Sequence, residues 1–142
     1  MIAEVVRIVA QLAAGTFAGA CLYILLVQHP VRTTLGATAG LADSRETIPR
    51  AERLQAPLLI VCLVAAAVDV VLTSRWTVLV GALLMLAVLV LTLASVLPIN
   101  RRLLAGEPAD HLAASPDLLA RWGRLHAART VLAVIGAVAL LL

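Results

Sequence analysis

Lysine is absent from this 142-residue chain, and charged and aromatic residues are scarce. Only 13% of the residues are charged, whereas soluble domains average about 25%. Apolar residues make up 63% of the chain, which is more apolar surface than one soluble core of this size can bury. This composition excludes a disordered chain and predicts an integral membrane protein.

Aromatic residues account for only 3% of the chain, so the apolar bulk consists of alanine, leucine and valine. This composition favours close packing between helices over a large aromatic-lined pocket. The net charge of +3 comes from arginines beside apolar runs, which predicts lipid headgroups and no nucleic acid as counterions. Cys21 and Cys62 both lie inside apolar runs, where we expect them to pack as small hydrophobic residues and to form no disulfide.

Four apolar stretches predict an all-α fold, a four-transmembrane-helix antiparallel bundle forming a single domain over residues 1–142. A hydrocarbon layer of about 30 Å needs roughly 20 residues of helix. The predicted spans cover about residues 8–28, 56–72, 76–97 and 117–142. Pro30 and Pro98 are expected to end the first and third spans, and Pro57 suits the first turn of the second.

Arginine is distributed unevenly between the connections that join these spans. A short connection, Thr73 to Arg75, predicts a hairpin between the second and third spans, with the two longer connections on the opposite side. Nine of the arginines lie within the two longer connections, residues 29–55 and 98–129, and only Arg7 and Arg75 lie on the other side. The bias predicts that both long connections lie in the cytoplasm and both termini outside. We expect the membrane to be a bacterial plasma membrane.

Polar side chains stand at the same end of each predicted span. His29 ends the first span, Gln55 begins the second, Asn100 follows the third and His126 precedes the fourth. Because the spans alternate in direction, we expect these groups to converge at the cytoplasmic mouth of the bundle, where small molecules often bind between helices. The expected cluster is His29, Arg32, Gln55, Asn100, Trp122, His126 and Arg129.

Three of these residues also have a structural explanation. His29 can be a helix terminator beside Pro30, Arg32 a headgroup contact, and Trp122 an interfacial anchor. Asp69, near the other end of the second span, is expected to pair with a polar neighbour.

The sequence lacks the motifs of phosphate-binding loops, dinucleotide-binding folds, thiol redox sites, zinc proteases and serine hydrolases. His29 and His126 are too few for a closed zinc site, but with Asn100, Gln55 or water they could hold copper or iron with open positions. The same two imidazoles could act as a metal-free acid–base pair. The sequence therefore requires no cofactor and leaves both chemistries open.

Four segments together resemble the anthrone-oxygenase-like family of small four-helix membrane proteins. They are residues 19–32, ending in His-Pro-Val-Arg, and residues 53–56, 97–101 and 121–130. The resemblance implies oxidation of a polycyclic aromatic anthrone to an anthraquinone with molecular oxygen. Matching these segments gives His29, Arg32, Asn100, His126 and Arg129 as the candidate catalytic residues, and Gln55 and Trp122 as the candidate substrate-binding residues.

Three functions are compatible with these features. The first is a membrane oxygenase for a lipophilic anthrone, phenol or quinol, in which His29 or His126 removes a proton while Arg129 and Asn100 stabilise the oxyanion. The second is a non-catalytic assembly or ligand-binding subunit of a membrane complex, and the third a carrier of quinones or lipids. The expected partners are the lipid bilayer, a lipophilic small molecule, and either a second copy or another membrane protein.

Overall fold

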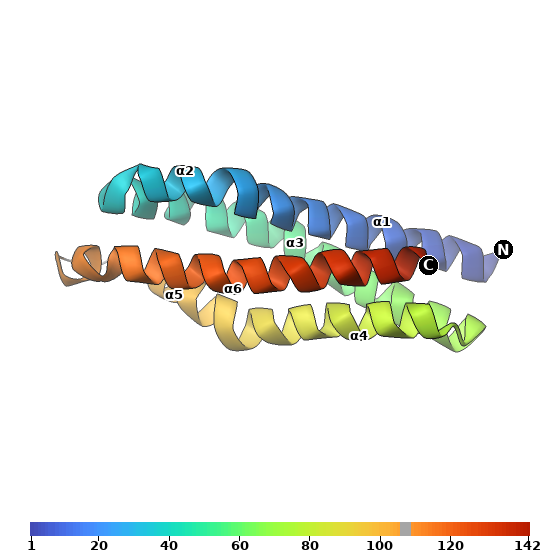
Figure 1. Ribbon diagram of the computed structural model, residues 1–142. Helices are drawn as coiled ribbons and strands as arrows, with labels where there is room; N and C mark the ends of the chain where they lie inside the picture. Colours follow the sequence, from blue (N-terminus) through green and yellow to red (C-terminus); the bar gives the residue numbers. More distant parts are fainter. Residues whose placement is uncertain (106–108) are drawn as a thin grey trace.

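Four long helical rods lie side by side in the described part of the chain (Figure 1). The structure is a computed structural model that describes the backbone of residues 1–105 and 109–142 and the side chains of residues 1–105 and 116–142. The first rod consists of α1 (Ile2–Tyr23), the π-helical turn η1 (Ile24–Gln28) and α2 (His29–Thr34), and the second is α3 (Gly36–Thr73). The third consists of α4 (Trp76–Leu91), the π-helical turn η2 (Thr92–Val96) and α5 (Leu97–Leu104), and the fourth is α6 (Ala109–Leu141).

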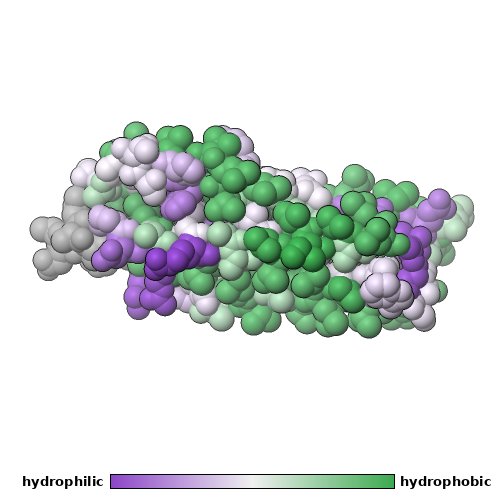
Figure 2. Space-filling view, viewed as in Figure 1, coloured by the Kyte–Doolittle hydropathy of each residue, from purple (hydrophilic) through white to green (hydrophobic). Residues whose placement is uncertain are grey.

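Each rod contains a segment long and apolar enough to cross a membrane, which confirms the predicted all-α membrane bundle. The segments are Ile2–Thr34, Gly36–Thr73, Trp76–Leu104 and Pro116–Leu141. With 38 residues, α3 is about 57 Å long, well beyond the hydrocarbon thickness of about 30 Å. Figure 2 shows hydrophobic side chains over the middle of the surface and hydrophilic ones toward both ends, among them the end where α2 and α5 lie.

Small residues fill the interior between α1, α3, α4 and α6. This buried cluster, here named the membrane core, includes Ala14, Ala66 and Ala133 around Phe17 and Met85. A Cβ atom added at Gly81 of α4 would lie 2.7 Å from Cγ of Leu140 on α6, so these two helices approach closely because Gly81 has no side chain. The packing matches what the scarcity of aromatic residues predicts.

A second buried cluster lies at the end of the bundle where α2 and α5 lie, beyond the predicted spans. This cluster, here named the mouth core, joins Ile24, Leu41, Ile48, Ile99, Leu103, Leu119 and Trp122. Its members from residues 29–55 and 98–129 stand on α3, α5 and α6, so helices occupy most of both expected connections. These helices form because each buries an apolar face beyond the membrane core.

The prolines do not end the helices, and the expected stops at Pro30 and Pro98 are wrong. A π-helical turn precedes each proline: the His29 N–H donates to the Ile24 carbonyl, and the Leu97 N–H donates to the Thr92 carbonyl. The wider turn makes room next to a proline ring and absorbs the break that its missing N–H causes. Pro57 likewise lies inside α3 rather than in its first turn.

Two tight reversals connect the rods. Ser74 adopts a left-handed conformation with φ of 54° between α3 and α4, which confirms the predicted hairpin. Gly36 has φ of +81° between α2 and α3, a conformation that favours glycine.

The end of the bundle with the two termini carries its own polar contacts. The carboxylate of Asp69 is buried and pairs with Nε of Arg7 at 3.1 Å, which confirms the expectation that Asp69 has a polar partner. Nε2 of Gln11 donates to the Leu140 carbonyl at 2.9 Å and ties α1 to α6. These contacts satisfy the polar groups of this end and form no part of the site described below.

Candidate functional site

Arg129 of α6 carries a positive charge into the bundle interior, between the membrane core and the mouth core. Arg129 is only 6% exposed to solvent. Nη2 donates to Oε1 of Gln55 at 3.0 Å and faces Nδ1 of His126 at 3.1 Å. The guanidinium carbon lies 5.8 Å from the centre of the Phe17 ring, within range of a cation–π interaction. Residues from α1, α3 and α6 therefore hold the guanidinium group.

His126 has both ring nitrogens in use. Nδ1 faces Arg129, which can only donate, and Nε2 lies 3.1 Å from the Cys21 carbonyl, which can only accept. A neutral imidazole with its proton on Nε2 satisfies both contacts. His126 therefore links α6 to α1 and orients Arg129.

The Trp122 indole is the centre of an aromatic group in the mouth core. The His126 ring stacks on it at a centroid distance of 4.7 Å, and the His29 ring lies 5.3 Å away with a tilt of 47°. The guanidinium carbon of Arg32 lies 5.1 Å from the indole centroid. Trp122 is only 4% exposed, so its side chain packs inside the protein and is not an anchor at the membrane–water interface.

Asn100 connects this aromatic group to a carboxylate. Nε1 of Trp122 donates to Oδ1 of Asn100 at 2.6 Å, and Nδ2 of Asn100 donates to Oε1 of Glu52 at 2.7 Å. Because an indole can only donate and an ionised carboxylate can only accept, the two contacts fix which way the amide faces. The chain of hydrogen bonds crosses from α6 through α5 to α3.

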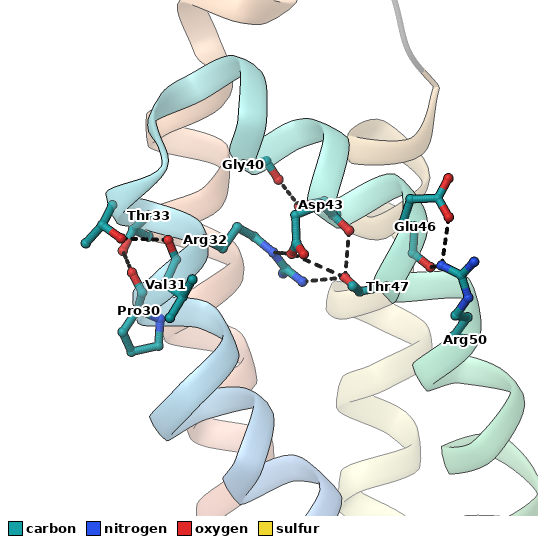
Figure 3. A network of polar contacts seen from close by, with 11 residues as sticks. Pro30, Val31, Arg32, Thr33, Gly40, Asp43, Glu46, Thr47 and Arg50 are labelled. Carbon is teal, nitrogen blue, oxygen red and sulfur yellow. Dashed lines mark hydrogen bonds and ion pairs between the residues drawn. The ribbon is translucent and has the colours of Figure 1, made fainter.

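Arg32 is held between α2 and α3, as Figure 3 shows. Nε donates to Oδ2 of Asp43 at 2.8 Å, and Nη2 donates to Oγ1 of Thr47 at 2.7 Å. The residue is 1% exposed, so it lies inside the protein rather than among lipid headgroups. Arg32 joins the two helices on either side of the Gly36 turn and presses against Trp122.

Gly123 is the point at which α6 passes His29. A Cβ atom added at Gly123 would run into the imidazole, with Cδ2 and Cε1 of His29 each at 2.9 Å. Nδ1 of His29 is buried and has no hydrogen-bond partner among the described residues. The His29 ring is therefore located by packing against Gly123 and Trp122.

A cavity of about 280 Å³ opens beside Arg129. Small-molecule pockets usually have volumes of at least about 300 Å³, so this cavity lies just below that range. Ala56 and Ile60 of α3 and Leu93 of η2 are exposed on its wall, so its mouth faces the lipid side of the bundle. Its lining is apolar apart from a few groups: Glu52, Gln55, Thr92 and Arg129.

Nε of Arg129 is buried and has no hydrogen-bond partner among the described residues. Because Arg129 lines a largely apolar cavity and has a buried donor without a described partner, it is a candidate site for an anionic or strongly polar oxygen of a ligand.

The structure brings all seven residues of the expected cluster to one end of the bundle. Gln55 and Arg129 line the cavity, while the other five lie outside its lining and contact one another or Arg129. Neither imidazole belongs to the cavity wall. No group of three or more His, Cys, Asp or Glu side chains suited to a metal ion occurs among the described residues, and metal binding by His29 and His126 stays a prediction.

Sequence reasoning missed Glu52, Phe17 and the Cys21 carbonyl. Glu52 and Gln55 stand three residues apart on α3 and share a helix face, which is the signal that could have identified Glu52. The apolar run that predicts the second span begins only at Ala56, so Glu52 lies outside it.

A sequence model of a known family, described as anthrone oxygenase, matches residues 45–139. The chain belongs to the anthrone oxygenase family. No curated protein and no solved structure matches it. The part shared with the anthrone oxygenase family contains the polar cavity residues Glu52, Gln55, Thr92 and Arg129, while His29 and Arg32 lie before it.

The contact between Gly123 and His29 predicts a coupled effect on stability. Gly123→Ala should lower the free energy of unfolding by about 1–3 kcal/mol, because the new methyl group displaces the imidazole. In a His29→Ala background the same change should cost little, since alanine is also the better helix former by up to about 1 kcal/mol. A double-mutant cycle of denaturant unfolding in mild detergent measures this coupling.

Gly15→Ala is the matched control, because a Cβ atom there meets nothing within 4 Å. An equal cost of Gly123→Ala with and without the His29 ring would contradict the contact.

Proposed function

We propose that this protein is a membrane oxygenase that acts on a lipophilic aromatic compound of the anthrone, phenol or quinol type. The observation that carries the proposal is Arg129, which lines a cavity with a lipid-facing mouth and whose buried Nε has no hydrogen-bond partner among the described residues. Membership of the anthrone oxygenase family supports the reaction class, in which a CH₂ group and O₂ become a carbonyl group and water.

The cavity suits a flat apolar molecule with one reactive oxygen. Leu59, Leu89 and Leu97 provide apolar walls for the rings. Arg129 would donate to the substrate oxygen, which becomes negatively charged when the neighbouring carbon loses a proton. A preorganised charged donor in an apolar site stabilises such an anion far more than water does, because it needs no reorganisation.

The other residues of the cluster would support this donor. Gln55 and His126 hold the guanidinium group, and Gln55, which lines the cavity, would also contact the substrate. His29, Arg32, Asn100 and Trp122 would keep the mouth core rigid around the site. A substrate dissolved in the bilayer would enter between α3 and η2 without passing through water.

The central prediction concerns Arg129. Arg129→Gln should reduce anthrone-dependent oxygen uptake about 100-fold or more, because loss of one oxyanion donor costs about 10²–10³ in rate. Arg129→Lys keeps the positive charge and should retain part of the activity. This variant also shows whether the fold tolerates replacement of the guanidinium group. Oxygen uptake by the purified protein in lipid nanodiscs, with folding checked by circular dichroism, is the measurement.

Arg121→Gln is the matched control, since Arg121 is exposed on the same helix and outside the cavity. Full turnover by Arg129→Gln would refute the assigned role. Binding of anthrone by the wild-type protein without oxygen uptake would favour the ligand-binding subunit instead.

The lateral entrance predicts a selective effect at Ala56. Ala56→Trp should raise KM for a lipophilic substrate about 10-fold or more, because the indole would fill the mouth of the cavity. Ala67→Trp, an exposed position on the same helix outside the cavity, should leave KM unchanged. Steady-state kinetics in nanodiscs compare the two, and equal KM values would place the entrance elsewhere.

We propose that the end with the mouth core faces the cytoplasm and that both termini face outward, because nine of the 11 arginines stand toward that end. A bacterial alkaline phosphatase fused to the C-terminus should be active, and a fluorescent protein fused there through the general secretion route should stay dark. The reverse pattern would invert the orientation.

A further inference from the structure

Glu52 is the one carboxylate among the described residues that line the cavity. It stands on α3 one turn before Gln55, and the Arg129 guanidinium belongs to the same cavity wall. An acceptor of protons and a donor to negative charge therefore face one small, largely apolar space. A reaction that removes a proton from carbon and leaves charge on oxygen needs this combination.

The Glu52 carboxylate is held in place by a neighbouring helix. Asn100 engages only one of its two oxygens, Oε1, and is itself fixed by Nε1 of Trp122. Trp122 is buried, so the anchor of this chain belongs to the mouth core rather than to solvent. An acceptor fixed in this way keeps its orientation when a ligand fills the cavity.

The two histidines are less suited to take the proton. His126 already uses Nδ1 toward Arg129 and Nε2 toward the Cys21 carbonyl. His29 packs on Gly123 and Trp122, and neither ring lines the cavity. A base has to reach the proton that it removes, at about 2.6–3.2 Å or through one water molecule.

We propose that Glu52 is the catalytic base of this site and removes the C–H proton of the bound aromatic substrate. This inference rests on the proposed function and replaces the histidines as proton acceptors. The substrate class that it implies is a ring ketone with an acidic CH₂ group conjugated to the carbonyl, as in anthrone.

The proton and electron balance of the reaction is complete with O₂ as co-reactant. Glu52 takes one proton, and the C–H electron pair moves through the ring system onto the carbonyl oxygen beside Arg129. Oxygen then forms a bond to that carbon and accepts two electrons, and the protonated Glu52 returns its proton to the resulting peroxide. Removal of the second C–H proton by Glu52 breaks the O–O bond, forms the new carbonyl group and releases hydroxide, which takes that proton and leaves as water.

The test separates proton removal from oxidation. Anthrone is incubated without oxygen in deuterated buffer with the protein in nanodiscs, and deuterium at its CH₂ group is followed by mass spectrometry above the rate with empty nanodiscs. The wild-type protein should accelerate this exchange, and Glu52→Gln should slow the accelerated rate about 100-fold or more. Glu46→Gln is the matched control, because Glu46 is an exposed carboxylate on the same helix.

Folding and ligand binding are measured on the same samples by circular dichroism and by quenching of protein fluorescence on binding of anthraquinone. Glu52→Gln should keep both, because the amide has the shape of the carboxylate. Exchange at the wild-type rate in Glu52→Gln would overturn the inference, as would a loss of exchange in His29→Ala but not in Glu52→Gln.

The outcomes also distinguish this inference from the proposed function. Exchange that depends on Glu52, without oxygen uptake when air is admitted, supports the base and refutes the oxygenase. Oxygen uptake that survives Glu52→Gln supports the oxygenase and refutes the base. If the wild-type protein gives neither exchange nor uptake, both are wrong.

Discussion

A guanidinium group buried among apolar helices is the constraint on which this structure depends. Burying an unpaired charge costs several kcal/mol even after relaxation, so Arg129 has to be compensated from several directions. Gln55 and His126 accept from it, and the Phe17 ring lies against it. These partners come from three helices, and the position of Arg129 therefore fixes how α1, α3 and α6 pack. An ionisable residue inside a membrane bundle is a candidate for a functional site.

The compensation of Arg129 is incomplete. Its Nη2 has two partners, whereas its buried Nε has none among the described residues, and Arg129 lines the cavity. The contacts that stabilise the charge in the protein therefore leave donor capacity for a ligand. The mouth core keeps this arrangement rigid, because Trp122 packs against His126 on one side of the network and donates to Asn100 on the other.

The bilayer explains why so much of the architecture follows from sequence. Hydrocarbon thickness fixes the length of each apolar span, and alternating direction then places the polar ends of the spans together. His29, Gln55, Asn100 and His126 meet at one end of the bundle for that reason. The short connection at Ser74 leaves no alternative to a hairpin.

Helix ends predicted from local sequence were wrong where tertiary packing overrides local preference. A proline inside a helix costs about 3 kcal/mol, which makes Pro30 and Pro98 appear to be stops. The π-helical turns before them and the burial of Ile99 and Leu103 in the mouth core offset that cost. Glu52 was hidden because its helix was expected to begin later, and the state of His126 depends on a carbonyl of Cys21 more than a hundred residues away in the chain.

The most direct test of the account is an experimental structure of the protein in nanodiscs with anthraquinone bound. We expect the ring system between α3 and η2, with one carbonyl oxygen within hydrogen-bond distance of Nε of Arg129. A ligand bound only on the outer surface of the bundle, or an Arg129 Nε that is paired with a protein group and closed off from the cavity, would contradict it.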